Sequence, residues 1–87
     1  MKKLYRIYTE HKKLPIIKSI VNRHFKGYTI IKTFGIWQGI PEKSLIIELI
    51  ATARDIKKIK SISKEIKSFN NQQAVLLTTR NIKSQLI

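Results

Sequence analysis

The spacing of apolar residues changes several times along the chain, and the order of these changes constrains the fold more than any other feature. Four segments are rich in β-branched and aromatic residues, as strands are: Lys3–Thr9, Tyr28–Ile36, Ser44–Ala51 and Ala74–Thr79. Two segments between them repeat apolar residues every three or four positions, as amphipathic helices do. Their stripes are Ile16, Ile17, Ile20, Val21, His24 and Phe25, then Ile56, Ile59, Ile62, Ile66 and Phe69.

Local signals support these boundaries. Pro15 suits the first turn of the first helix, Leu14–Phe25, and Gly27 lies just beyond its end. Thr52 and Asp55 have the spacing of a capping box before the second helix. A short loop containing glycine joins the second and third strands, which indicates a hairpin.

The predicted order is therefore βαββαβ. Two right-handed crossovers fold such a chain into a four-stranded antiparallel sheet with two helices on one face, the ferredoxin-like α+β architecture. We expect residues 1–87 to form one domain, and the pattern assigns no element to the tail from Arg80 to Ile87. One sheet face and two sheet edges stay open, and a trimer that packs these faces inward would cover them.

The composition excludes several kinds of chemistry. The chain has no cysteine and only two histidines, His11 and His24, so thiol catalysis, nucleophilic triads and a metal site are not expected. No apolar run has the length of a membrane span, and no signal peptide is recognised, so we expect a cytoplasmic protein. The net charge of +13 fits a polyanionic partner such as nucleic acid, or solubility and compositional drift alone.

Two of the five acidic residues fall in one stretch, "GIWQGIPEKSLIIELI". Glu48 shares a strand face with Ile46 and Ile50, so burial of that face would require a cationic partner, Arg6 or Lys32. This favours a structural role for Glu48 at a subunit interface. Glu42 follows Pro41 in the predicted turn, where the alternatives are a solvated charge and an active-site carboxylate.

The stretch continues into a wider pattern. Gly35-x-Trp37-x-Gly39 precedes Glu42, and an apolar strand and a helix then lead to "NNQQAVLL", residues 70–77. This pattern resembles the phage-encoded S-adenosylmethionine (SAM) lyases, long called hydrolases, a family with a PII-like ferredoxin fold. In that family a G-x-Tyr hairpin precedes a carboxylate, and a polar Gln/Glu pair opens the last strand.

The resemblance covers Phe34 to Thr78 and implies site residues. Glu42 matches the carboxylate and is the catalytic residue it implies, while Gln72 and Gln73 match the polar pair and would bind substrate. Trp37 takes the place of the family's Tyr as a further substrate-binding residue, which removes a hydroxyl. The hairpin is also shorter here than in the family.

The implied activity uses no cofactor. Such lyases are trimers that hold SAM between subunits, where the substrate's own carboxylate attacks its side chain. The products are methylthioadenosine and homoserine lactone, and a phage origin would place the reaction in the host cytoplasm. Trp37 would face the sulfonium or adenine, and Glu42 the ribose hydroxyls or the cation.

Two other functions remain open. The first is a non-catalytic PII-like binder of nucleotides or small anions, with the same assembly. The second is a nucleic-acid-binding module that exposes Tyr5, Tyr8 and Tyr28 on an open sheet for base stacking. Each site residue also has a structural interpretation: Trp37 as a loop anchor, and Gln72 and Gln73 as turn residues after the second helix.

Overall fold

A computed structural model describes residues 1–87 and confirms the predicted order of elements. The strands are β1 (Lys2–Glu10), β2 (Thr29–Trp37), β3 (Ile40–Thr52) and β4 (Leu76–Ile82); the helices are α1 (Leu14–Asn22) and α2 (Ile56–Phe69), with a short 3-10 turn, η1 (Ala53–Asp55), before α2. All neighbouring strands are antiparallel, in the order β2-β3-β1-β4. This is the ferredoxin-like α+β fold.

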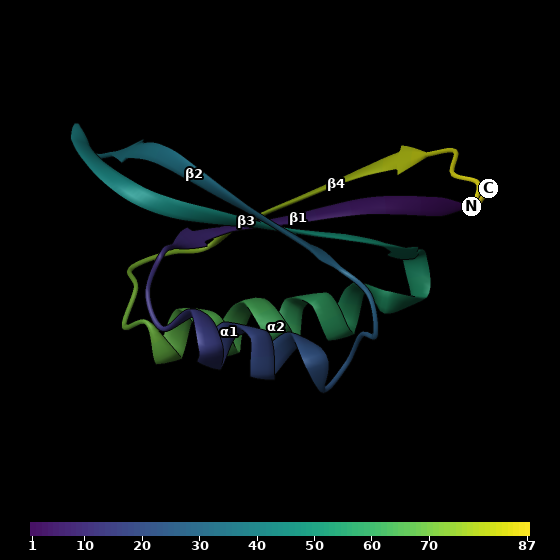
Figure 1. Cartoon of the computed structure of the whole chain (residues 1–87), viewed down its shortest axis with the longest axis horizontal. Helices are drawn as coiled ribbons and strands as arrows, with labels where there is room; N and C mark the ends of the chain where they lie inside the picture. Colours follow the sequence, from purple (N-terminus) through teal and green to yellow (C-terminus); the bar gives the residue numbers. More distant parts are fainter.

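The molecule has two layers, with both helices on one face of the sheet (Figure 1). The core lies between the layers. It consists of alternate residues of β1 and β3 and the apolar stripes of the helices: Tyr5, Ile7, Leu45, Ile47, Leu49, Ala51, Ile17, Ile20, Val21, Ile59, Ile62 and Ile66. The other sheet face has no second layer, and we call it the open face. Neither helix is long and apolar enough to cross a membrane.

The start of the second helical segment is capped as predicted. The backbone N–H of Thr52 donates to the Asp55 carboxylate at 2.9 Å, and the Thr52 hydroxyl donates to the same oxygen at 3.1 Å. The backbone hydrogen bond is the main reason that the pKa of Asp55 is lowered, with smaller contributions from the Thr52 hydroxyl and from Lys58 and Lys2, while burial opposes them. This cap fixes the direction in which the chain leaves β3.

The hairpin between β2 and β3 is tighter than predicted. Only Gln38 and Gly39 form its turn, and both have positive φ, at 51° and 77°. Two such residues form the turn that suits the twist of antiparallel strands. As a result β3 begins at Ile40 rather than Ser44, and Pro41 lies inside the strand, where β2 is its only neighbour.

The hairpin therefore overhangs the rest of the sheet. The last residue of β1, Glu10, pairs with Ser44, and His11 donates a backbone hydrogen bond to the Lys43 carbonyl, so the residues of β3 before Lys43 have β2 as their only neighbouring strand. Figure 1 shows this end of the hairpin projecting away from the helices. The apolar side chains of Phe34, Ile36 and Ile40 on it are 67–71% exposed.

The structure corrects three expectations about aromatic residues. Tyr5 is fully buried on the helix side, because it alternates in phase with Ile7, and its hydroxyl donates to the Thr52 carbonyl at 2.8 Å. Tyr28 precedes β2, and its hydroxyl donates to Asn22 at 2.8 Å. Phe69 is 48% exposed and lies outside the core cluster, since it belongs to the last turn of α2. Of the three tyrosines, only Tyr8 remains on the open face.

Candidate functional site

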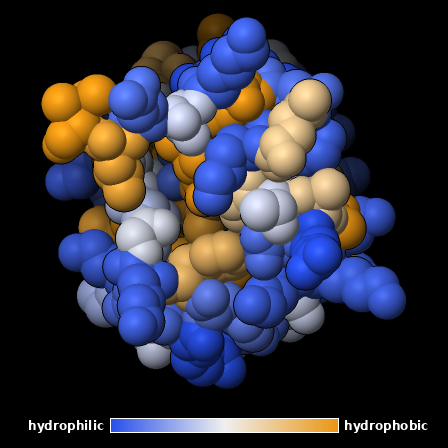
Figure 2. Space-filling view, turned by 90° about the vertical axis from the view of Figure 1, so that its right-hand side faces the viewer, coloured by the Kyte–Doolittle hydropathy of each residue, from blue (hydrophilic) through white to orange (hydrophobic).

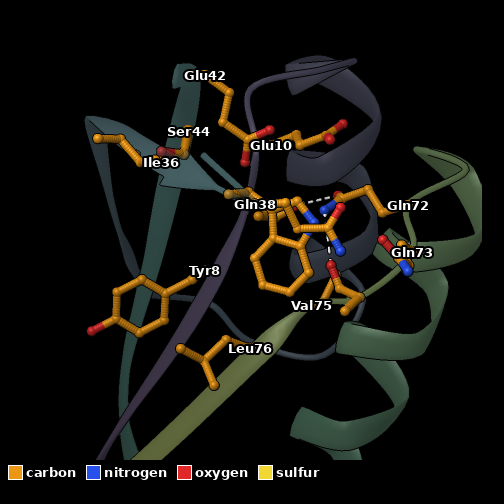
Figure 3. Close-up of a pocket in the computed structure, with 14 residues that line it drawn as sticks. Tyr8, Glu10, Ile36, Gln38, Glu42, Ser44, Gln72, Gln73, Val75 and Leu76 are labelled. Carbon is orange, nitrogen blue, oxygen red and sulfur yellow. Dashed lines mark hydrogen bonds between the residues drawn. The ribbon is translucent and has the colours of Figure 1, made fainter. Parts of the chain in front are cut away.

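A cavity of about 500 Å³ lies between the overhanging hairpin and the segment that leads from α2 into β4. It exists because β1 ends at Glu10 while β2 and β3 continue, so that nothing fills the space beside the hairpin. Its walls come from the ends of β1, β2 and β3, from the hairpin turn and from residues 72–76. Figure 3 shows Glu42 and Glu10 at one end of the cavity and Gln72 and Gln73 beside it.

All four residues that the sequence pattern singled out line this cavity. Trp37 and Glu42 come from the hairpin, and Gln72 and Gln73 come from the segment after α2. Trp37 is 49% exposed, so about half of this residue is not covered by packing within the chain. The fold thus brings together residues about thirty positions apart in the sequence.

The two glutamines differ in what their side chains do. The Gln72 oxygen accepts hydrogen bonds from the Thr9 hydroxyl and, at 2.9 Å, from the buried Asn70 amide; the Gln72 amide donates to the Ala74 carbonyl at 3.2 Å. These contacts tie the segment before β4 to the end of β1. The Gln73 side chain is exposed and makes no hydrogen bond to the protein, so its amide is free to contact a ligand.

The charge of the cavity is opposite to that of the molecule. Glu10 and Glu42 line it, and none of the 18 Lys and Arg residues does. One Glu10 oxygen lies 2.7 Å from Lys12 Nζ. Lys12 does not line the cavity, but its positive charge partly offsets the negative charge of Glu10. Glu42 takes part in no ion pair. The cavity is therefore an acidic site on a strongly basic protein.

Sequence reasoning missed the contribution of β1. Tyr8 and Glu10 line the cavity from that strand, next to Ser44 of β3. The available signal was alternation: Tyr8 and Glu10 are out of phase with the buried Tyr5 and Ile7, which places them on the open face. Their position beside the hairpin depended on the strand register, which the sequence alone does not fix.

Glu48 lies outside the cavity, in the middle of the open face. It pairs with Arg6, whose Nε and Nη2 atoms both lie 2.8 Å from the same Glu48 oxygen. Lys32, the other partner considered, is paired with Leu45 in the register and so points to the helix side. No group of three His, Cys, Asp or Glu side chains lies close enough together to hold a metal ion.

No protein-family model matches the sequence, and no curated protein matches it either. Solved structures do share the fold. A DUF3240 family protein from Shewanella baltica superposes with a TM-score of 0.80 at 8% identity, over 99% of this chain and 94% of that chain. A phage SAM lyase in the apo state superposes with a TM-score of 0.75 at 17% identity, over 90% and 78%.

A third match is a nitrogen regulatory PII-like protein from Thiomonas intermedia, bound to ADP, AMP and bicarbonate. It superposes with a TM-score of 0.69 at 16% identity, over 99% of this chain and 96% of that chain. At these identities the likeness concerns the fold and not the ligand. The chain has the ferredoxin-like fold of PII-like proteins, which a phage SAM lyase shares.

Proposed function

We propose that this protein is a SAM lyase that binds its substrate in the cavity beside the hairpin. The observation that carries the proposal is the charge of that cavity. A chain with a net charge of +13 lines it with Glu10 and Glu42 and with no Lys or Arg. A sulfonium cation suits such a site, because a nearby carboxylate favours a positive charge that has lost part of its water.

The lining residues suit the rest of the molecule as well. The exposed indole of Trp37 offers a face for the sulfonium or for stacking on adenine. Glu42 accepts hydrogen bonds from the ribose hydroxyls or faces the cation. Gln73, whose amide is free, contacts the polar edges of the substrate, and Gln72 holds the segment that presents Gln73.

The reaction needs little from the protein beyond positioning. A carboxylate oxygen of SAM forms a bond to its own γ-carbon, the bond from that carbon to sulfur breaks, and the electron pair leaves with sulfur. The products are homoserine lactone and methylthioadenosine, and no proton moves. Holding the methionine arm in the attack geometry can supply several kcal/mol of the barrier, roughly 7–11 in the best intramolecular cases.

Glu42 has a defined place in this scheme. Charge separation disappears as the substrate carboxylate neutralises the sulfonium, so a carboxylate beside the sulfur stabilises the bound substrate more than the transition state. Loss of a Glu42–sulfonium contact would therefore raise KM. Loss of a Glu42–ribose contact that fixes the attack geometry would lower kcat as well.

The active form in this proposal is a homotrimer whose open faces pack inward. Exposed apolar side chains on the hairpin and the open face support it: Phe34, Ile36, Ile40, Ile50 and Leu76 are each more than half exposed. Phe34, Ile36 and Ile40 lie together on the hairpin, and a cluster of exposed apolar side chains marks a surface that contacts another chain. A neighbouring subunit would cover the hairpin and close the cavity.

The likeness to a PII-like protein bound to ADP and AMP supports an alternative, a nucleotide binder without turnover. The cavity offers no cation of its own to phosphate groups, so this alternative requires Lys or Arg from a neighbouring subunit. An adenosine ligand that carries a positive charge fits the lining better than one that carries phosphates.

The test is incubation of the purified protein with SAM, with methylthioadenosine and homoserine lactone followed by mass spectrometry. We expect turnover by the wild type and a loss of at least about tenfold in kcat/KM in Glu42→Gln. Glu65→Gln is the matched control, because Glu65 lies on α2 and pairs with Arg23. No product from a folded trimer would refute the lyase, and binding of ADP or AMP by that sample would establish the alternative.

A further inference from the structure

A row of lysines runs along the outer side of α2. Lys57, Lys60, Lys64 and Lys67 follow one another at intervals of three or four, so they share one side of the helix. All four are exposed, and none takes part in an ion pair. We call these four residues the lysine row. It extends for about 15 Å along the helix axis, given the rise per residue.

The lysine row contains no acidic residue. Ser61 and Ser68, both exposed, are the side chains that lie among the lysines on this side of the helix. The one acidic residue of α2, Glu65, lies on the side toward α1, where it pairs with Arg23. Figure 2 shows hydrophilic side chains covering the helix layer at the end of the molecule that carries the termini.

The fold itself does not use the lysine row. Like charges three or four positions apart repel one another on a helix, and a cation in the first turn, such as Lys57, opposes the helix dipole. The acidic residue at the start of α2, Asp55, caps the helix and lies 4.0 Å from Lys58, which is not part of the lysine row. The helix is held to the sheet by Ile59, Ile62 and Ile66, which are fully buried on its other side.

We propose that the lysine row binds the phosphate backbone of a nucleic acid. Its four ammonium groups and two hydroxyls are donors that phosphate oxygens accept, arranged in a line as phosphates are along a strand. The lysine row has no Arg, Asn or Gln that could read base edges in a bidentate way, so binding does not depend on base sequence. None of these four lysines lines the acidic cavity. The proposal does not rest on the proposed function.

Nucleic acid fits these observations better than a membrane does. Helices that lie in a membrane surface insert an apolar face beside their basic face. The apolar face of α2 is fully buried in the core of this protein, so it offers nothing to insert. The lysine row presents only charged and hydroxyl groups, which suit a backbone of phosphates in water.

The experiment measures binding of the full-length protein to a fluorescent 20-base-pair DNA duplex and a matched single-stranded RNA, by anisotropy at several salt concentrations. Four phosphate contacts predict a slope of about −3.6 for log K against log salt on the duplex, and about −2.8 on the single strand. The variant Lys57→Gln/Lys60→Gln/Lys64→Gln/Lys67→Gln should lose most of this slope and bind at least tenfold more weakly at 50 mM salt, by about the same factor on different sequences.

The matched control replaces four lysines elsewhere, Lys2, Lys32, Lys43 and Lys83, which are also exposed and unpaired. This control changes the net charge by the same amount but leaves the lysine row intact. It should therefore keep most of the affinity and slope. Equal weakening in both variants, with unchanged circular dichroism, would show attraction by net charge alone and overturn the proposal. Absence of binding by the wild type, or binding only to vesicles with 30% phosphatidylserine, would overturn it too.

Discussion

Arg6 and Glu48 face each other directly across β1 and β3, and two guanidinium nitrogens of Arg6 lie 2.8 Å from one oxygen of Glu48. The two side chains are the charged centre of the open face, and Ile46 and Ile50 flank Glu48 along its strand. In a single chain the pair is partly exposed, at 37% for the Arg6 side chain and 23% for Glu48. Its energetic value depends on whether another subunit covers it.

We expect Glu48→Ala to separate these two situations. On an exposed face the pair contributes less than about 1 kcal/mol. In a closed interface the loss of Glu48 leaves the Arg6 charge buried without a partner, which costs about 3–5 kcal/mol. We expect the larger effect: the proposed trimer should dissociate at micromolar concentration in this variant, as measured by light scattering after gel filtration.

Glu65→Ala is the control for that experiment, because it also removes a carboxylate that pairs with an arginine, Arg23, but on the helix side. It should leave the mass of the assembly unchanged. A wild-type protein that is monomeric at all concentrations, with a Glu48→Ala effect below 1 kcal/mol in urea unfolding, would contradict burial of the open face.

Asp55→Asn should remove part of the stability that the capping box supplies, about 1 kcal/mol at pH 7. The pKa of Asp55 is lowered in the folded state, chiefly by the backbone hydrogen bond from Thr52. A lowered folded pKa means that the stabilisation is complete above the unfolded pKa, near 3.9, and is lost as the pH falls through the folded value. Urea unfolding of both proteins at pH 7 and near pH 2 should show the difference shrinking in acid.

Glu10→Gln tests whether this acid-dependent loss is specific to the cap. Its carboxylate lies beside Lys12 and is not part of a helix start. We expect its effect at pH 7 to stay within about 0.5–1 kcal/mol, the usual value of an ion pair near the surface. A difference between Asp55→Asn and wild type that persists below pH 3 would mean that the Asn side chain strains the turn rather than failing to cap it.

The spacing of apolar residues was enough to predict the order of elements and the helix side of the sheet. Ile59, Ile62 and Ile66 are buried at helical intervals, and Leu45, Ile47 and Leu49 at strand intervals, because burial imposes those periods on the sequence. Alternation also placed Glu48 on the open face with Arg6 or Lys32 as its partner, and the structure pairs it with Arg6. The order of elements and the buried faces depend on local geometry, which a short stretch of sequence determines, whereas the choice of Arg6 over Lys32 depends on the strand register.

The cavity was harder to predict because it depends on register and on turn length. A two-residue turn at Gln38 and Gly39 lengthens β3 back to Ile40, and the end of β1 at Glu10 then leaves the hairpin without a neighbour. Neither end is marked by the apolar pattern. The same holds for Tyr28, which reads as a strand residue but precedes β2 and bonds to Asn22.

Gln72 and Gln73 should behave differently when each is changed to Ala. Gln72 accepts hydrogen bonds from Thr9 and Asn70, and Asn70 is buried, so its loss leaves polar groups without partners and should cost about 1–3 kcal/mol. Gln73 is exposed and bonds to nothing, so its loss should change stability by less than about 0.5 kcal/mol.

Ligand binding should show the reverse order for these residues. Gln73→Ala should weaken SAM binding several-fold in calorimetric titration with unchanged thermal stability. Gln72→Ala should weaken SAM binding only as far as it disorders the segment before β4. Thr9→Val should lose as much stability as Gln72→Ala, because Thr9 is a donor to the Gln72 oxygen. A stable Gln72→Ala protein would show that Ala74 and the backbone, rather than this amide, hold the segment.

The sign of the charge in the cavity predicts which of two near-identical ligands binds better. S-adenosylhomocysteine has the same adenosine and amino acid groups as SAM but a neutral sulfur. With Glu10 and Glu42 in the lining and no Lys or Arg, we expect SAM to bind at least about tenfold more tightly, which corresponds to about 1.4 kcal/mol. Trp37 is the only tryptophan and lines the cavity, so its fluorescence reports both titrations without a label.

In Glu42→Gln the preference for SAM should shrink. Comparing the two ligands on the two proteins isolates the interaction between the sulfonium charge and the Glu42 carboxylate. SAM stays intact during the measurement if each titration is shorter than the time of one catalytic turnover, or if it is done at low temperature. An equal affinity for the two ligands in the wild type would show that the carboxylates do not face the sulfur, whereas tight binding of ADP would show that a neighbouring subunit brings cations into the site.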